Sequence, residues 1–321
     1  MNNKGKEKSR RDFLRKGFAL GVGSVIGMGA LPALAASGGE ETSGEKIKLL
    51  TAEGQLVEVD KASIKCKTAN CEPAKGDAAR IGIPGRSFVM VIDLSKCTNA
   101  RKCVESCQHG HDLLPSQEWI PIHLMQDNKN SEPYWFPKPC YHCDNPPCVK
   151  VCPVGATFKR TDNAVLIDAD RCIGCKFCIS ACPYSARRFN WEDRVSYSSN
   201  DANYSPETSL PGQHGVVGKC DFCPDRSREG KLPYCSSNCP MGAIYFGDAN
   251  EDAITNGSET LRFRETIKTR AGYRYLEALG TNPNVYYLSA ADKMFPYERG
   301  FKNLNEDQLK GYDNIRSKSK E

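Results

Sequence analysis

Fifteen of the chain's 17 cysteines fall into four runs with regular internal spacing. The third run is C-x2-C-x2-C-x3-C-P, and the second and fourth runs share its C-x2-C start and its C-x3-C-P end. The first run is C-x5-C-x3-C, with Ala100 at the position where a second cysteine would stand. In chain order the runs are Cys97, Cys103 and Cys107; Cys140, Cys143, Cys148 and Cys152; Cys172, Cys175, Cys178 and Cys182; and Cys220, Cys223, Cys235 and Cys239. Thiolates at such spacings are ligands of iron–sulfur clusters, in which three cysteines of a run hold one cluster and the fourth reaches another.

Three other interpretations of these cysteines fit the spacing less well. Zinc ribbons use two C-x2-C pairs separated by a longer loop. Disulfide bonds are permitted in an exported chain, but the members of a C-x2-C pair are poorly placed to bridge each other, and 17 is odd. Covalent c-type haem needs C-x-x-C-H, and no histidine follows these pairs. Because a line of iron–sulfur clusters carries electrons, the sequence predicts an electron-transfer protein.

The positive charge of the chain is concentrated at its N-terminus. Of the 44 Lys/Arg and 39 Asp/Glu residues, seven and two respectively lie in residues 1–35, so the rest of the chain carries no net charge. Bound clusters with their thiolates would add negative charge. We therefore expect no nucleic-acid partner.

Residues 1–35 have the pattern of a targeting segment that lies outside the fold. Residues 9–16, S-R-R-D-F-L-R-K, resemble the twin-arginine export signal, an apolar glycine-rich stretch follows, and Ala33-Leu34-Ala35 offers a cleavage site. The alternative is an uncleaved anchor, although this stretch is marginal for a hydrocarbon core of about 30 Å. We expect a mature protein on the periplasmic (outer) face of the cytoplasmic membrane, because the twin-arginine route exports folded proteins.

The sequences that follow the last cysteine of three runs are related to one another. They are PVGATFKR after Cys152, PYSARRFN after Cys182 and PMGAIYFG after Cys239. Each unit predicts a cysteine loop, a short helix carrying the last cysteine, and a strand, which is the two-fold repeat of a dicluster ferredoxin. The predicted fold is α+β, with two ferredoxin-like dicluster modules. The inner module is continuous over residues 138–192, and the outer one combines the first and fourth runs.

The remaining segments predict the domain boundaries. A hairpin over residues 46–59 and apolar, β-branched strands at 88–94 and 164–168 follow from the residue pattern, and a helix is expected over 266–279. The predicted organisation is a signal peptide (1–35), a linker with the N-terminal hairpin (36–87), a four-cluster domain (88–250) and a C-terminal docking extension (251–321).

Three motifs carry a family resemblance. KPCYHCDNPPCVKVCPVGATFKR (138–160), DRCIGCKFCISACPYSARRFNW (170–191) and KCDFCPDRSREGKLPYCSSNCPMGAIYFGD (219–248) resemble the iron–sulfur (β) subunits of the dimethyl sulfoxide, polysulfide and tetrathionate reductase family. The resemblance covers about residues 88–250. It implies an electron conduit without its own substrate site, bound to a polytopic quinone-interacting membrane subunit and to a molybdopterin catalytic subunit or a multihaem cytochrome.

The same resemblance implies that the runs pair crosswise into four ligand sets, named here sites A to D. Site A is Cys97, Cys103 and Cys239; site B is Cys107, Cys220, Cys223 and Cys235; site C is Cys140, Cys143, Cys148 and Cys182; site D is Cys152, Cys172, Cys175 and Cys178. Sites B, C and D would each hold a [4Fe–4S] cluster. Because Ala100 leaves site A with three thiolates, we expect a [3Fe–4S] cluster there; a substitute ligand or an empty site are the alternatives.

Cys66 and Cys71 lie outside the four runs. A disulfide between them, two free thiols, or a substitute ligand for site A are all compatible with the sequence. His142, inside a cysteine loop, is expected to donate a hydrogen bond near cluster sulfur, and His109 and His111 could line the cluster next to Cys107; a packing role is the alternative for each. Two other functions stay open, a free-standing periplasmic electron shuttle and a self-sufficient reductase acting at an exposed cluster.

Overall fold

The computed structural model describes residues 46–50, 56–60, 73–192 and 204–312. The predicted signal peptide and Cys66 and Cys71 lie outside these residues. In the part of the chain that is described, no helix combines the length and the apolar character needed to cross a membrane. The predicted N-terminal hairpin is confirmed, since β1 (Lys46–Leu50) pairs antiparallel with β2 (Leu56–Asp60).

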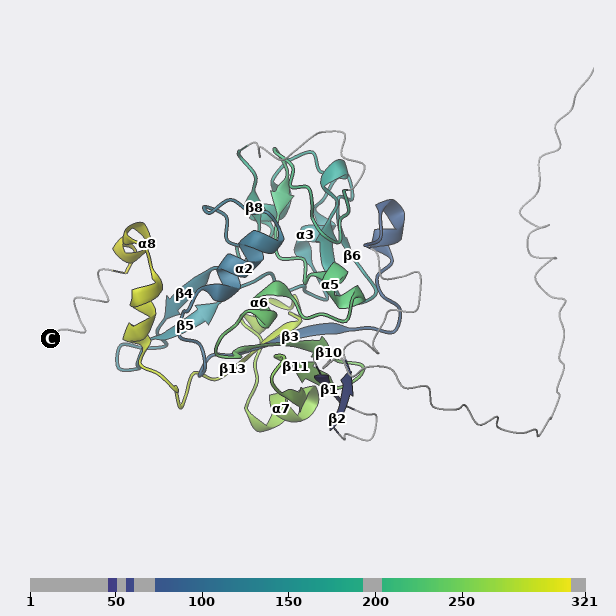
Figure 1. The fold of residues 1–321 in the computed structure, drawn as a ribbon. Helices are drawn as coiled ribbons and strands as arrows, with labels where there is room; N and C mark the ends of the chain where they lie inside the picture. Colours follow the sequence, from purple (N-terminus) through teal and green to yellow (C-terminus); the bar gives the residue numbers. More distant parts are fainter. Residues whose placement is uncertain (1–45, 51–55, 61–72, 193–203, 313–321) are drawn as a thin grey trace, which may run out of the picture. The chain divides into compact units, whose positions relative to one another are not determined.

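A five-stranded sheet forms the centre of the outer module (Figure 1). Its order is β12-β11-β10-β3-β13, with β3 (Phe88–Asp93) antiparallel to β10 (Ile244–Asp248) and parallel to β13 (Val285–Leu288). Every residue of β3 is buried, because alternate side chains enter different hydrophobic clusters on the two faces of the sheet. This explains why the strand is almost continuously apolar in sequence.

The segment after residue 250 is not separate from this sheet. β11 (Ala253–Thr255), β12 (Thr260–Arg262) and β13 are three of its five strands. The predicted boundary at residue 250 therefore cuts through a sheet, and docking by residues 251–321 stays a prediction. The helix expected over 266–279 is also too long: α7 is Phe263–Thr269, because Ala271 has a φ of 47° and Gly272 follows.

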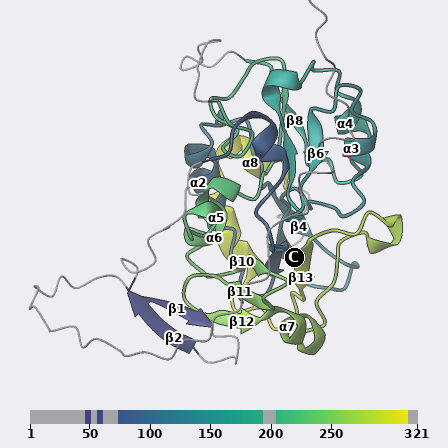
Figure 2. The same cartoon turned by 90° about the vertical axis from the view of Figure 1, so that its right-hand side faces the viewer.

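The two modules each contain a pair of packed helices (Figure 2). In the inner module α3 (Pro147–Lys150) contacts α4 (Phe177–Ser180), beside the antiparallel strands β6 (Thr157–Lys159) and β7 (Val165–Ile167). In the outer module α2 (Lys102–Gly110) contacts α6 (Tyr234–Ser237), which lies beside β10. The α+β fold with two ferredoxin-like modules is thus confirmed.

The cysteine repeat differs in one detail from its prediction. The short helices α3, α4 and α6 carry the third cysteine of each run, and the fourth cysteine comes two residues after the helix ends. Proline follows each fourth cysteine and disfavours helical geometry at the residue before it. The fourth cysteine is therefore free to turn toward the neighbouring site.

The other elements connect or cover these modules. β4 and β5 form a short antiparallel hairpin, and β8 pairs antiparallel with β9, which follows much later in the chain. The 3-10 helix η5 lies against β5, where Trp135 Nε1 donates to the carbonyl of Tyr297 (2.8 Å). The bounds are η2 (Gly76–Arg80), β4 (Ile122–Met125), β5 (Tyr134–Pro137), η3 (Ala169–Arg171), β8 (Arg188–Phe189), β9 (Val217–Gly218), α5 (Pro224–Arg228), η4 (Glu277–Leu279), η5 (Tyr297–Asn303) and α8 (Glu306–Lys310).

Candidate iron–sulfur centres

The structure gathers the described cysteines into the same four groups that the crosswise pairing predicts. All fifteen of these thiols are free, and none forms a disulfide among the described residues. Cysteines from runs far apart in the sequence meet because α2 packs on α6 and α3 packs on α4. The chain therefore presents four separate sets of sulfur donors.

Site D is the set most open to solvent. Its four cysteines line one cavity together with Ile173 and Lys176, and Cys175 is exposed. Burial alone would raise the pKa of Cys152, but backbone N–H groups of Thr157, Val154 and Ala156 point at its sulfur, and the net pKa is lowered. This loop is thus built to hold a thiolate.

Sites C and B are more enclosed. In site C the pKa of Cys143 is raised to about 12, mainly by burial and then by the neighbouring Cys140. A hydrogen bond with Thr281 lowers it somewhat, and Cys148 and Cys182 raise it further. In site B all four cysteines are buried. Several thiolates packed together without solvent repel one another, so these groups suit a bound cation or cluster that supplies positive charge.

Site A retains its cavity in spite of the missing cysteine. Cys97, Cys103, Cys239 and Ala100 are among the residues that line it. The space among the lining atoms, counting the part that is open to solvent, is about 320 Å³. Among the described residues that line site A there is no histidine, carboxylate or further cysteine.

The four sites follow one another in the order A, B, C, D. Burial and the thiolates of site A itself raise the pKa of Cys103, and Cys235 of site B lies close enough to raise it further, so sites A and B are neighbours. Burial, Asp221 and Cys235 likewise raise the pKa of Cys220, and Cys140 of site C adds to the effect. Sites C and D share a neighbour, because Arg187 interacts with Cys148 of one and Cys178 of the other.

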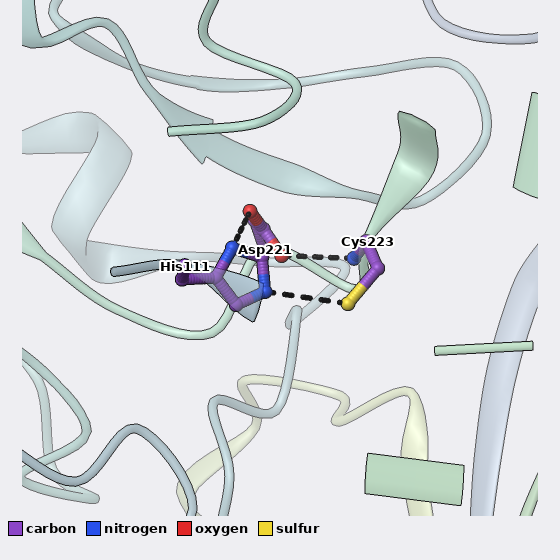
Figure 3. Close-up of side chains that lie close together, drawn as sticks. All are labelled: His111, Asp221 and Cys223. Atoms are coloured by element: carbon purple, nitrogen blue, oxygen red, sulfur yellow. Dashed lines mark hydrogen bonds and ion pairs between the residues drawn. The ribbon is translucent and has the colours of Figure 1, made fainter. Parts of the chain in front are cut away.

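Three buried side chains at site B form a polar cluster that the sequence predicts only in part (Figure 3). His111 Nε2 lies 3.4 Å from Cys223 Sγ, and its Nδ1 lies 3.6 Å from Asp221 Oδ2 and 3.3 Å from the carbonyl of Thr208. Asp221 Oδ1 accepts the Cys223 N–H at 2.8 Å. His111 therefore contacts a cysteine of the predicted site, as expected, whereas Asp221 was not predicted.

The other two histidines near cysteines behave differently. His109 is exposed. His142 is buried, but its partners are backbone groups: Nδ1 accepts the Val165 N–H (2.9 Å), and Nε2 contacts the carbonyl of Cys220 (3.0 Å). Burial, and then the positive charge of Lys219, lower the pKa of His142 well below its usual value, so the ring is neutral with its proton on Nε2. These hydrogen bonds join the loop of His142 to β7 and to the loop of Cys220, and they do not reach sulfur.

Besides the cysteines, a buried arginine fits the presence of iron–sulfur clusters. Arg187 is buried between sites C and D, and its Nε and Nη2 atoms have no oxygen or nitrogen acceptor among the described residues; the sulfurs of Cys148 and Cys178 lie within hydrogen-bonding reach of it. Buried donors are normally satisfied, and sulfur acceptors between the two cysteine sets would satisfy these. This residue was not predicted from the sequence because its position between the sites depends on the folded arrangement.

Comparison with known proteins also indicates an iron–sulfur protein. A 4Fe-4S dicluster domain matches residues 131–199 and 209–249. The B subunit of selenate reductase from Mesobacillus selenatarsenatis is 35% identical over 302 residues, which is 88% of this chain and 98% of that relative. The chain belongs to the family of iron–sulfur B subunits of selenate, tetrathionate and dimethyl sulfoxide reductases.

Two further relatives of this iron–sulfur subunit show the breadth of the family. The B subunit of tetrathionate reductase from Salmonella typhimurium is 31% identical over 255 residues, or 77% of this chain and 87% of the relative. The iron-sulfur cluster-binding subunit of menaquinone reductase from Nitratidesulfovibrio vulgaris is 36% identical over 231 residues, or 62% and 88%. These relatives are iron–sulfur subunits of oxidoreductases, which supports an electron-transfer role and, indirectly, the expectation that this subunit is not the catalytic one.

Proposed function

We propose that this iron–sulfur subunit carries electrons through three [4Fe–4S] clusters at sites B, C and D and one [3Fe–4S] cluster at site A. It would connect a polytopic quinone-interacting membrane subunit with a molybdopterin catalytic subunit or a multihaem cytochrome. The observation that carries the proposal is that the four cysteine sets are neighbours in series, A beside B, B beside C and C beside D, with the most exposed set at the D end. A line of this kind has two ends, and each end can serve one partner.

The contribution of the chain is to hold and to tune the clusters. Each bound cluster supplies reversible one-electron chemistry. The cysteines fix the positions of the four centres, and burial of sites B and C excludes water from the middle of the line. Backbone N–H groups at Cys152 and side chains such as His111 adjust the local electrostatics.

The [3Fe–4S] assignment at site A rests on the donor set. Three cysteines and Ala100 line the cavity at site A, whereas four cysteines line the one at site D. Thr98 and Met241 are the only other described lining residues with a side-chain oxygen or sulfur, and neither is a strong ligand for cluster iron. Loss of one iron and one thiolate raises the reduction potential, since cluster type and net charge set it.

The surface around site D supports partner docking at this end. Ile173, Phe177 and Trp191 are each at least 60% exposed, and the first two flank the exposed Cys175 in sequence. Large apolar side chains grouped on a surface mark interaction sites more often than chance. We further propose export by the twin-arginine route and a place on the periplasmic face of the cytoplasmic membrane, based on residues 9–16.

Gentle purification of the chain from native membranes tests this function. We expect a polytopic membrane subunit and a molybdopterin protein or multihaem cytochrome to copurify with it, in a complex containing iron and acid-labile sulfide. Recovery of a lone soluble protein with full iron would replace the complex by a diffusing shuttle. Turnover of polysulfide, tetrathionate or nitrite by the isolated chain would instead establish a reductase with its own substrate site.

A further inference from the structure

We propose that Arg187 is a cation shared by the clusters of sites C and D, donating hydrogen bonds to sulfur at both sites and raising both reduction potentials. The inference rests on the proposed function, because it needs clusters at these sites. It goes further in assigning the electrostatic link between two neighbouring centres to one side chain. Burial, donors without an oxygen or nitrogen acceptor and the position of Arg187 in the repeat support it.

Arg187 is buried without a carboxylate partner. Its exposed fraction is 2%, and no ion pair with an acidic residue is formed within the described residues. Its Nη1 atom donates to Thr157 Oγ1 at 3.1 Å, while Nε and Nη2 have no oxygen or nitrogen acceptor there, and the sulfurs of Cys148 and Cys178 lie within hydrogen-bonding reach of the guanidinium. Burying a charge without a partner is costly, so the fold requires an anionic group near this guanidinium.

Two other buried cations, Arg160 and Lys219, have acceptors for their charged groups. Arg160 pairs with Asp162 and Glu207, all three with fully buried side chains. Lys219 donates to the backbone carbonyls of Val165 and Cys220. Among these buried cations, Arg187 alone has donors without an oxygen or nitrogen acceptor in the described structure, and those donors lie where sites C and D meet.

Thiolates from both sites act on Arg187. Burial opposes its positive charge, but the attraction of Cys148, Cys178 and Cys140 outweighs this, so the pKa of Arg187 is raised above its already high value. Cys148 and Cys140 belong to site C, and Cys178 belongs to site D. Arg187 therefore stays charged, and its charge is felt at the two sites together.

The repeat explains why a single residue reaches both sites. Arg187 is the fifth residue after Cys182, and Thr157 is the fifth residue after Cys152. These equivalent residues of the two half-modules meet through the Nη1–Oγ1 hydrogen bond, so they lie where the halves join. In the outer module the fifth residue after Cys239 is Ile244, which is apolar. The chain therefore places this cation between sites C and D and has no equivalent of it after Cys239.

A positive charge and hydrogen bonds at cluster sulfur favour the more negative, reduced state of a centre. Removal of Arg187 should therefore make both sites harder to reduce. Sites A and B should keep their potentials, because the thiolates that attract Arg187 belong to sites C and D. This paired shift distinguishes a bridging cation from a residue that only stabilises the fold.

The test is an anaerobic redox titration, followed by low-temperature EPR, of the complex carrying Arg187→Met, Arg187→Lys or Arg188→Met. The signals of sites C and D are first assigned with Cys148→Ser and Cys175→Ser. The matched control Arg188 is adjacent and only partly buried, and it donates to the carbonyl of Ser185 (2.7 Å). We expect R187M to lower the midpoint potentials of both sites by at least about 59 mV, which corresponds to a tenfold change in a one-electron equilibrium constant. R187K should recover part of the shift, and R188M should shift them less.

Unchanged potentials at sites C and D in fully loaded R187M would overturn the inference, as would a shift at one of these sites only. If R187M fails to hold iron, R187K decides: selective retention of the centres at sites C and D supports the inference, and equal loss from all four sites contradicts it. A wild-type complex without clusters at sites C and D would contradict the proposed function itself, so the two failures are distinguishable.

Discussion

His111 Nε2 lies 3.4 Å from the Sγ atom of Cys223, although 112 residues separate the two in sequence. The opposite ring nitrogen faces two acceptors, the Asp221 carboxylate and the Thr208 carbonyl. The ring is held between Trp119, at a centroid distance of 4.8 Å, and Tyr234. A ring fixed in this way directs its second nitrogen at a predicted cluster ligand.

Replacement of His111 should lower the reduction potential of site B. In His111→Phe the aromatic packing is kept and the contact with sulfur is lost. A hydrogen bond from Nε2–H to sulfur that strengthens by about 1 kcal/mol on reduction corresponds to about 40 mV in a one-electron couple. His109→Phe is the matched control because that side chain is exposed. An EPR redox titration in which H111F and H109F behave alike would show that the contact does not tune the site.

Replacement of Ala100 should complete site A. In Ala100→Cys a fourth thiolate enters the cavity that Ala100 lines. We expect the [3Fe–4S] EPR signal of air-oxidised protein to disappear, iron to rise by about one atom per chain, and the potential to fall because of the added negative charge. Ala100→Ser, which has a similar size and a weak ligand, should keep the signal. Loss of the [3Fe–4S] signal in both variants would mean that a larger side chain in the cavity, and not a fourth thiolate, removes the signal.

Replacement of Gly300 should loosen the C-terminal segment. A Cβ atom at this position would lie 2.2 Å from Trp135 Nε1, and the Gly300 carbonyl accepts the side-chain amide of Asn99 next to Ala100 (3.1 Å). Gly300→Ala should therefore destabilise the protein by about 1–3 kcal/mol and speed proteolysis of the segment. In Gly311→Ala the nearest atom is at 3.4 Å, so little change is expected. Equal melting temperatures for the two variants would contradict this packing argument.

Glu207 should make the protein sensitive to acid. Burial raises its pKa, but hydrogen bonds from Arg228 and the charge of Arg160 outweigh burial, and the net pKa is lowered from 4.5. The folded form then binds the proton more weakly than the unfolded form. The stabilisation is complete well above pH 4.5 and is lost as the pH falls through the lowered value.

Glu207→Gln should cost about 3–5 kcal/mol at pH 7, because it leaves the buried Arg160 and the partly buried Arg228 without the carboxylate that they share. Its melting temperature should also fall less steeply than that of the wild type below pH 5. Glu229→Gln, which removes an exposed pair with Lys231, should cost less than about 1 kcal/mol. A wild type and an E207Q variant with parallel pH profiles would contradict the assignment.

Much of the cysteine arrangement could be predicted from the sequence because the information is local. Each run has its own spacing, and the repeat after Cys152, Cys182 and Cys239 predicts similar units. The strand before Cys97 was also predicted, since a run of β-branched and apolar residues is typical of a strand buried on both faces. The family resemblance supplied the crosswise pairing, and the structure brings the same cysteines together.

The rest depends on contacts between distant segments. Nothing in the sequence around Asp221 places it against His111, and nothing around Arg187 shows that its charge is buried without an acid. The strands after residue 250 are short, with three or four residues each, and their place in the sheet follows from pairing with β10 and β3. The position of each fourth cysteine just beyond its helix follows from the proline after it, a local signal that the prediction did not use fully.

The most direct test of the four-site line is the iron content of the anaerobically purified complex. The iron in other subunits is subtracted, and the remainder is expressed per copy of this chain. EPR spectra of the oxidised and the reduced complex accompany the measurement. Three [4Fe–4S] clusters and one [3Fe–4S] cluster predict about 15 iron atoms, a [3Fe–4S] signal after oxidation, and broadened, spin-coupled signals from neighbouring centres after reduction. About 12 iron atoms with no [3Fe–4S] signal would remove site A from the line and contradict the account.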